Sequence, residues 1–300
     1  LINYVQGVMY IGQKDSVTIR ISRAAVEKGF SLFHLGKILH AKFHEEFGTI
    51  FDKVQVKIYT NKEKVDQILA QAKEVYQKRD ARIEGMIDES VDHFYSCTIC
   101  QSVAPSHVCV ISPERMGLCG AYNWMDCKAS YKINPYGPNQ PIKKGEVIDS
   151  RLGQWKGVNE FVFKASYQKI EHYNLYSLIY DPTTTCGCCE CIAAVLPLCN
   201  GVMSVNREYK DITPCGMDFN TLAGLVARGE VIPGFVGHSK YNITQRKWLI
   251  GDGGIKRLVW MPKMLKEEVR ERLKKRSEEI GIPDFIDMIA DETIGVTEEE

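Results

Sequence analysis

The chain has 300 residues, with 38 basic and 38 acidic side chains and a formal net charge of zero at pH 7. This balance gives no reason to expect a nucleic-acid partner, because binding to phosphate backbones draws on an excess of basic residues. No apolar run is long enough to predict a membrane span. Because the sequence begins at Leu1 rather than Met, we expect it to be part of a longer chain.

The first eighty residues contain no cysteine and predict alternating strands and helices. Apolar and polar residues alternate over 17–22 and again over 54–58, which is typical of half-buried strands. Apolar residues recur at helical spacing over 32–43, after Ser31, and over 65–75, after Asn61. Residues 1–80 therefore predict a small α/β unit, and the charged run 73–84 is the candidate domain junction.

Residues 81–300 predict a loop-rich α+β domain built around a metal site. Short alternating segments are separated by Gly/Pro-rich loops such as Asn134–Pro138. Near the end, an amphipathic helix from about Pro262 to Ile280 carries Leu265, Val269 and Leu273 on one face. The predicted fold class is thus α/β plus α+β.

Four of the eleven cysteines, Cys97, Cys100, Cys109 and Cys119, have the spacing Cys-x2-Cys-x8-Cys-x9-Cys. Their clustering in a medium-sized chain favours metal ligation in a reducing compartment over a disulfide framework. Four-sulfur sites hold zinc or an iron–sulfur cluster. The spacing is neither that of a bacterial ferredoxin nor that of a zinc ribbon. The Gly/Pro-rich segment between the ligands favours an iron–sulfur cluster and leaves zinc open.

A second motif, Cys186-Gly187-Cys188, offers one metal a flat chelate of two sulfurs and the backbone nitrogens of Gly187 and Cys188. Deprotonated amides are stabilised by metals with a strong square-planar preference, Ni(II) or Cu(II). Glycine suits the middle position because it has no Cβ to clash as the backbone flattens. A lone Cys-Gly-Cys is more often a cysteine-rich turn, but this one accompanies the four upstream cysteines.

Several segments around these motifs resemble acetyl-CoA synthase, the acetyl-forming component of the carbon monoxide dehydrogenase/acetyl-CoA synthase complex. The resemblance runs in order from Asp92 to about Lys266. The matching segments are Tyr95–Cys109, Pro113–Trp124, Thr185–Cys188, Thr213–Met217, Pro233–His238 and Val259–Lys263. It implies the family's A-cluster, a [4Fe–4S] cubane joined through one cysteine to a dinuclear nickel unit.

The resemblance also implies the ligands. The cubane would be held by Cys97, Cys100, Cys109 and Cys119, with Cys100 bridging to the proximal metal. Cys186 and Cys188 would bridge the proximal and distal nickel ions, and the nitrogens of Gly187 and Cys188 would complete the distal site. Three thiolates at the proximal position would also accept copper or zinc, since affinity alone does not favour nickel over copper.

The activity that the resemblance implies is that of an acyltransferase in the cytoplasm of an anaerobe. It assembles acetyl-CoA from CO, a methyl group carried by a corrinoid iron–sulfur protein, and coenzyme A. Family members are usually longer, with an N-terminal helical domain that docks on carbon monoxide dehydrogenase. Two alternatives remain open: an electron-transfer iron–sulfur protein, which would leave Cys-Gly-Cys idle, and a zinc-stapled interaction module.

The remaining cysteines and a nearby histidine have simpler interpretations. His107 lies two residues before Cys109, and because four thiolates satisfy a cubane we expect it to support the site rather than bind metal. The other five cysteines are expected to pack as small apolar residues and to be dispensable for metal binding. They are Cys127, Cys189, Cys191, Cys199 and Cys215.

Overall fold

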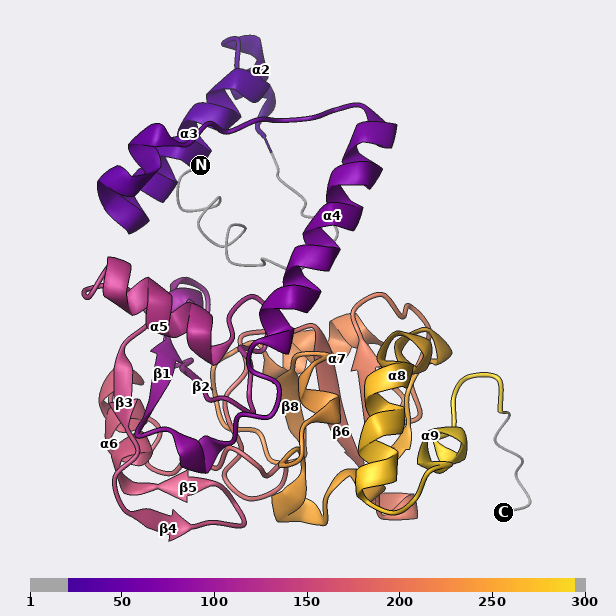
Figure 1. Cartoon of the computed structure of the whole chain (residues 1–300). Helices are drawn as coiled ribbons and strands as arrows, with labels where there is room; N and C mark the ends of the chain where they lie inside the picture. Colours follow the sequence, from indigo (N-terminus) through magenta and orange to yellow (C-terminus); the bar gives the residue numbers. More distant parts are fainter. Residues whose placement is uncertain (1–20, 295–300) are drawn as a thin grey trace.

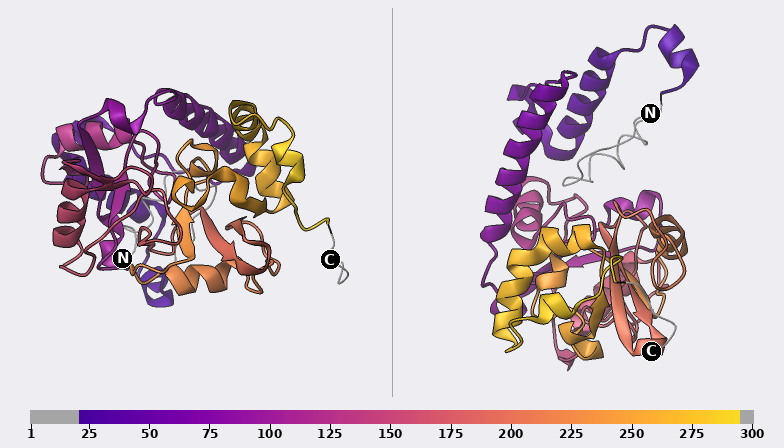
Figure 2. Two further views of the ribbon diagram at one scale, coloured as in Figure 1. Left: turned by 90° about the horizontal axis from the view of Figure 1, so that it is seen from below. Right: turned by 90° about the vertical axis from the view of Figure 1, so that its right-hand side faces the viewer.

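The computed structural model describes residues 21–294 (Figure 1). The described N-terminal part is helical, and its elements are α2 (Arg23–Glu27), α3 (Leu32–Phe47), the 3-10 helix η1 (Gly48–Lys53) and α4 (Lys62–Ala81). The helices predicted after Ser31 and Asn61 are confirmed, and the Asn61 side chain caps α4 by accepting the N–H of Lys64. α2, α3 and η1 stand apart from the elements that follow α4, and α4 joins the two parts (Figures 1 and 2).

The strand predicted over 54–58 is wrong. This segment has no regular secondary structure and joins no sheet among the described residues. Its Val54 carbonyl lies 3.1 Å from Nε2 of His40 on α3, so a helix side chain takes the place of a strand partner. The other predicted strand, 17–22, lies almost wholly outside the described residues, and Ser22 caps α2. The described part of the predicted α/β unit is therefore helical, while the chain as a whole combines helices and sheets.

A first group of elements surrounds a three-stranded antiparallel sheet with the order β2-β1-β3. Two helices and a short hairpin complete this group, and two 3-10 turns flank β1. The elements are η2 (Asp88–Ser90), β1 (His93–Cys97), η3 (Ile99–Ser102), β2 (Cys109–Ile111), α5 (Trp124–Ile133), β3 (Pro141–Lys143), β4 (Val147–Asp149), β5 (Gln154–Trp155) and α6 (Lys156–Ala165). Their core centres on Phe94 and Trp155, whose rings meet edge to face at 5.1 Å.

A second group surrounds a four-stranded sheet with the order β8-β6-β7-β9, in which only the β7–β9 pair is parallel. Its strands are β6 (Cys191–Leu196), β7 (Gly201–Asn206), β8 (Phe235–His238) and β9 (Leu258–Trp260). Its helices are α7 (Phe219–Val226), α8 (Lys263–Glu279) and α9 (Phe285–Met288). The short 3-10 turns are η4 (Pro197–Cys199), η5 (Asn242–Thr244), η6 (Ile250–Asp252) and η7 (Ile255–Arg257).

Side chains of β6 alternate between the two faces of this sheet, as the pleat requires. Ile192 and Ala194 pack in the core that contains α7, whereas Cys191 packs with α8 and α9. The predicted C-terminal helix is confirmed as α8, and its predicted apolar face is fully buried. Among the described helices, none combines the length and apolar character that crossing a bilayer requires.

Candidate metal centre

The first half of the candidate centre is built on the β1–β2 hairpin. Cys97 ends β1 and pairs in register with Cys109, which begins β2. Cys100 lies in η3, and Cys119 follows β2 in a loop. All four side chains line one cavity, together with Cys186 from much further along the chain. The fold therefore brings together the four cysteines that the spacing singled out.

Hydrogen-bond donors face the sulfurs of this cavity. Three sulfurs each receive a backbone N–H, and the donor–acceptor pairs are Ile99 to Cys97, Leu118 to Cys109 and Ala121 to Cys119. The Asn139 side chain adds a further donor at Cys97. Donors of this kind stabilise thiolates and are typical of iron–sulfur sites, where they help to set the reduction potential.

Burial opposes the charge that these donors favour. It raises the pKa of Cys97 to about 12 and that of Cys109 to about 11, and it raises the pKa of Cys119 as well. The neighbouring thiolates repel one another and raise the pKa of Cys97 and of Cys119 further, so these sulfurs ionise together only if a cation joins them. A partly buried set of four sulfurs, with N–H donors aimed at three of them, thus fits a positively charged cluster.

The second half of the centre is a triad formed by Cys100, Cys186 and Cys188, whose sulfurs all lie within 4.8 Å of one another. The Cys188 sulfur is 2.7 Å from that of Cys186 and 3.4 Å from that of Cys100. Hydrogen bonding with the Cys186 thiol, and then with Cys188, raises the pKa of Cys100 far above its ordinary value. Cys100 therefore belongs both to the four-cysteine cavity and to this triad.

Gly187 is fixed by its backbone and by its surroundings. Its φ of +75° lies in the region that favours glycine. A Cβ at this position would lie 2.9 Å from Cβ of Ala227 and 3.1 Å from the carbonyl oxygen of Ala223, both at the C-terminal end of α7. The sequence predicted glycine from the planarity of the chelate, and the fold adds the close approach of a helix.

Three consecutive threonines anchor the segment that enters the Cys-Gly-Cys loop. Each hydroxyl bonds to a different part of the chain, and the pairs are Thr183 with Arg115 (2.7 Å), Thr184 with His107 (2.9 Å) and Thr185 with the N–H of Gly237 (2.8 Å). The segment is thereby tied to the β2 region on one side and to β8 on the other. The position of Cys186 consequently depends on contacts that are distant in sequence.

The segment leaving the loop is tied to the loop that carries Cys119. The Glu190 N–H donates to the carbonyl of Leu118 at 3.0 Å, and the Glu190 carboxylate packs directly over Gly120, where any Cβ would lie 2.5 Å from it. From the opposite direction, Arg79 of α4 donates to the carbonyls of Gly120 and Ala121 at 3.2 and 2.9 Å. The segment that leaves the Cys-Gly-Cys loop and the loop that carries Cys119 are thus bonded to each other.

His107 takes the supporting position expected for it. It is fully buried, does not line the cysteine cavity, and lies with Nε2 3.2 Å from the Cys109 sulfur. Burial lowers the pKa of His107 to about 4, so the ring is neutral near pH 7. The Thr184 hydroxyl oxygen accepts the N–H of Val108 at 3.4 Å and lies 2.9 Å from Nδ1 of His107, and a thiolate at Cys109 can only accept a hydrogen bond. This arrangement assigns the ring proton to Nε2, facing the sulfur.

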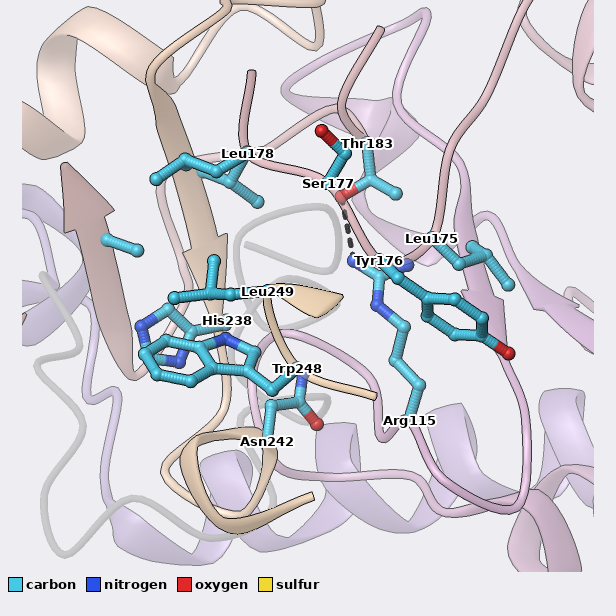
Figure 3. A pocket seen from close by; sticks show the side chains of 12 residues that line it. Arg115, Leu175, Tyr176, Ser177, Leu178, Thr183, His238, Asn242, Trp248 and Leu249 are labelled. Carbon is cyan, nitrogen blue, oxygen red and sulfur yellow. Dashed lines mark hydrogen bonds between the residues drawn. The ribbon is translucent and has the colours of Figure 1, made fainter. Parts of the chain in front are cut away.

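A second cavity contains no cysteine (Figure 3). Its wall includes His238 and Trp248, and Arg115 reaches across to Thr183. The cavity holds about 30 Å³, which is room for a water molecule. Its connection to the metal centre is structural, because Arg115 fixes the threonine segment that leads to Cys186.

The other cysteines behave largely as expected of small apolar residues. Cys127, Cys189 and Cys191 are fully buried, and Cys215 packs partly against the core beside α7. The expectation that Cys199 packs as a small apolar residue is wrong, because Cys199 is exposed in the turn η4 between β6 and β7. Sequence reasoning did not single out Arg207, Arg115, Asn139 or Glu190, whose support of the centre arises only from tertiary contacts.

Comparisons with known proteins agree with the resemblance. A family model that describes the C-terminal part of the ACS/CODH beta subunit matches residues 76–300, and one described as "CO dehydrogenase/acetyl-CoA synthase complex beta subunit" matches residues 1–65. The carbon monoxide dehydrogenase/acetyl-CoA synthase subunit alpha of Moorella thermoacetica is 50% identical over 300 residues, which are 100% of this chain and 41% of that protein.

Two further relatives extend the comparison. The acetyl-CoA decarbonylase/synthase complex subunit beta of Methanopyrus kandleri is 45% identical over 99% of this chain and 62% of its own length. A solved C-terminal domain of an acetyl-coenzyme A synthase alpha subunit is 49% identical over 38% of this chain and 83% of that one, with a TM-score of 0.35, which adds nothing to the fold described above. The chain spans 41% and 62% of the lengths of the first two relatives.

Proposed function

Because this chain belongs to the family defined by the C-terminal part of the ACS/CODH beta subunit, we propose that it carries the acetyl-forming site of a carbon monoxide dehydrogenase/acetyl-CoA synthase complex. It is then an acyltransferase whose substrates are CO, a methyl group and coenzyme A. Its protein partners are a corrinoid iron–sulfur protein, which carries the methyl group, and carbon monoxide dehydrogenase.

The observation that supports this proposal most directly is the overlap of the two groups. Cys100, one of the four spaced cysteines, also belongs to the triad, and Cys186 of the triad also lines the four-cysteine cavity. In the proposal, Cys97, Cys100, Cys109 and Cys119 hold a [4Fe–4S] cluster. Cys100, Cys186 and Cys188 hold the proximal metal, and Cys186 and Cys188 with the nitrogens of Gly187 and Cys188 hold the distal nickel. Neither an electron-transfer cluster nor a zinc staple needs a cysteine in both groups.

When bound, such a cluster supplies carbon–carbon bond formation between CO and the methyl group. The chain's own part is to position the ligands and to exclude water. Cys100, Cys186 and Cys188 would hold the proximal metal through three thiolates, which would leave it able to bind a substrate. Cys186 is only 7% exposed, so its sulfur is shielded from solvent. The supports from Arg79, Glu190 and the threonines hold the two halves in register.

The test is to load the chain with iron and nickel anaerobically and to supply methylated corrinoid protein, CO and coenzyme A. Acetyl-CoA that depends on nickel is the expected product. Because we find a single ligand set in the sequence, the same preparation should not oxidise CO to CO₂. Robust CO oxidation, or acetyl-CoA formed equally well without nickel, would contradict the proposal.

The division of the chain at residue 80 is part of the same proposal. α4 ends at Ala81, and the two family models leave a gap between residues 65 and 76, so both observations support a junction along this helix. Limited proteolysis of the loaded chain should cut first near α4 and leave residues 81–300 with their metals.

A further inference from the structure

Arg207 follows β7 and reaches back to the Cys-Gly-Cys loop, twenty residues earlier in the sequence. Its Nη2 atom donates to the carbonyl oxygen of Gly187 at 2.7 Å and to that of Cys189 at 3.1 Å. The first of these bonds lies at the short end of the range for a charged donor. The carbonyl of Gly187 belongs to the same peptide group as the nitrogen of Cys188, which is a ligand in the proposed distal site.

The guanidinium group is held firmly in this position. Its carbon lies 4.9 Å from the ring centroid of Phe219, the first residue of α7, and that ring is only 2% exposed. No carboxylate forms an ion pair with Arg207 among the described residues, and its buried Nε has no hydrogen-bond partner there. The positive charge of Arg207 is therefore directed at the loop rather than neutralised by an acidic side chain.

The chemistry of the peptide explains what this charge can do. A metal that binds through the nitrogen of Cys188 replaces its proton, so the peptide becomes an anion whose charge is shared between nitrogen and oxygen. Two such peptides and two thiolates outweigh the charge of one divalent ion, which leaves the site negative. A guanidinium at the oxygen stabilises this anion without competing for the nitrogen.

We propose that Arg207 is a positioning residue for the distal metal, which holds the Gly187–Cys188 peptide in place and stabilises its anionic, metal-bound form. This inference rests on the proposed function, since it takes that peptide nitrogen to be a ligand. It assigns to Arg207 a selective role, because only a metal that binds through peptide nitrogen benefits from it. The iron of the four-cysteine cavity does not.

The test measures nickel retention against a competing chelator in the full chain already loaded with iron. Arg207→Met keeps the apolar stem and removes both hydrogen bonds and the charge. Arg207→Lys keeps the charge but replaces the planar guanidinium with an ammonium group. We expect Arg207→Met to lower nickel affinity about 10- to 100-fold, with Arg207→Lys between it and the native chain and with iron content unchanged in both. The matched control is Arg257→Met, since Arg257 lies beside Asn200 at the opposite end of β7.

Chemical rescue distinguishes stabilisation of the anionic peptide from a purely structural role of the Arg207 side chain. In Arg207→Ala, ethylguanidinium should restore nickel retention, and sodium chloride at the same ionic strength should not. Nickel K-edge spectra of the rescued protein should show the square-planar signature of the native chain. Loss of iron and nickel together, without rescue, would overturn the inference. So would an Arg207→Met variant that retains nickel as well as Arg257→Met.

Failure of this inference differs from failure of the proposed function. If the native chain binds nickel and the Arg207 variants bind it equally well, only the role of Arg207 is wrong. If the iron-loaded native chain binds no nickel, the proposed function fails, and the inference fails with it.

Discussion

The hairpin that carries Cys97 and Cys109 is held by its own backbone, whereas the Cys-Gly-Cys loop is held by side chains from distant segments. In the hairpin, paired strands place Cys97 and Cys109 opposite each other, and the amide of Ile99, two residues further on, faces the Cys97 sulfur. The loop depends instead on the threonines before it, on Glu190 after it and on Arg207. Iron binding should therefore tolerate changes near the loop that abolish nickel binding.

Cys188→Ala is expected to produce the largest difference between nickel binding and iron binding. It removes a ligand of both proposed nickel ions but none of the four cavity cysteines. Nickel binding and acetyl-CoA formation should become undetectable, while iron content stays within experimental error of the native chain. Metal analysis after anaerobic loading checks this. The matched control, Cys189→Ala, should retain both metals, and a loss of iron in Cys188→Ala would show that the halves are not independent.

Gly187→Val should produce the next largest effect. The new side chain meets both an unfavourable φ of +75° and the Cβ of Ala227, so the loop must shift. We expect nickel loading to fall at least about tenfold with iron nearly unchanged. Gly216→Val is the control, because Gly216 has a similar φ of +81° but no atom near its missing Cβ. If both variants lose nickel equally, backbone strain alone accounts for the effect and the packing against α7 does not matter.

His107→Ala tests the hydrogen-bonded environment of the first half. Removing the N–H that faces the Cys109 sulfur should make the reduction potential of the cluster more negative. One such bond is worth on the order of 1 kcal/mol, or roughly 50 mV. A potentiometric titration followed by electron paramagnetic resonance measures the shift. Thr184→Val keeps the His107 ring but removes the hydroxyl that contacts its Nδ1 atom, so it should shift the potential less. An unchanged potential in His107→Ala would mean that the ring does not donate to sulfur.

The sheet that supports the loop should lose stability in acid through His238. Burial lowers the pKa of His238 to about 4 in the folded chain, from 6.5 in an unfolded one. The unfolded state therefore binds the proton first, so this contribution is complete above pH 6.5 and is lost as the pH falls towards 4. The loss amounts to about 3 kcal/mol. Urea unfolding of metal-free protein should show a flatter pH dependence in His238→Gln, and parallel curves would contradict the assignment.

The smallest effect is expected from Cys199→Ser. This thiol is exposed in η4, away from both halves of the centre, so metal content should be unchanged and the unfolding free energy should stay within about 0.5 kcal/mol of the native value. Cys191→Ser provides the contrast, because it places a hydroxyl in the core between β6 and α8 and should destabilise the fold. Loss of either metal in Cys199→Ser would place this cysteine in the centre.

Particular residues show how far prediction from the sequence reached. The stripe Leu265, Val269 and Leu273 predicted a helix whose face is buried, and α8 has that form. The alternation over 54–58 predicted a strand, yet a strand needs a neighbour, and here the backbone bonds to His40 instead. Local periodicity reports which face of a segment is apolar, but it does not report which partner that face will find.

The same distinction holds for the metal centre. The sequence by itself determined which residue types could bind metal and their grouping, because ligand chemistry and short spacing are local properties: four cysteines in one loop region and two around a glycine. Local spacing did not link Cys100 to the second motif, and only the family resemblance implied that link. The tertiary structure brings Cys100 into both groups, leaves no room beside α7 for a Cβ on Gly187, and places Arg207 against the loop. Each of these depends on chain folding that brings together residues from 20 to 88 positions apart, which no local pattern encodes.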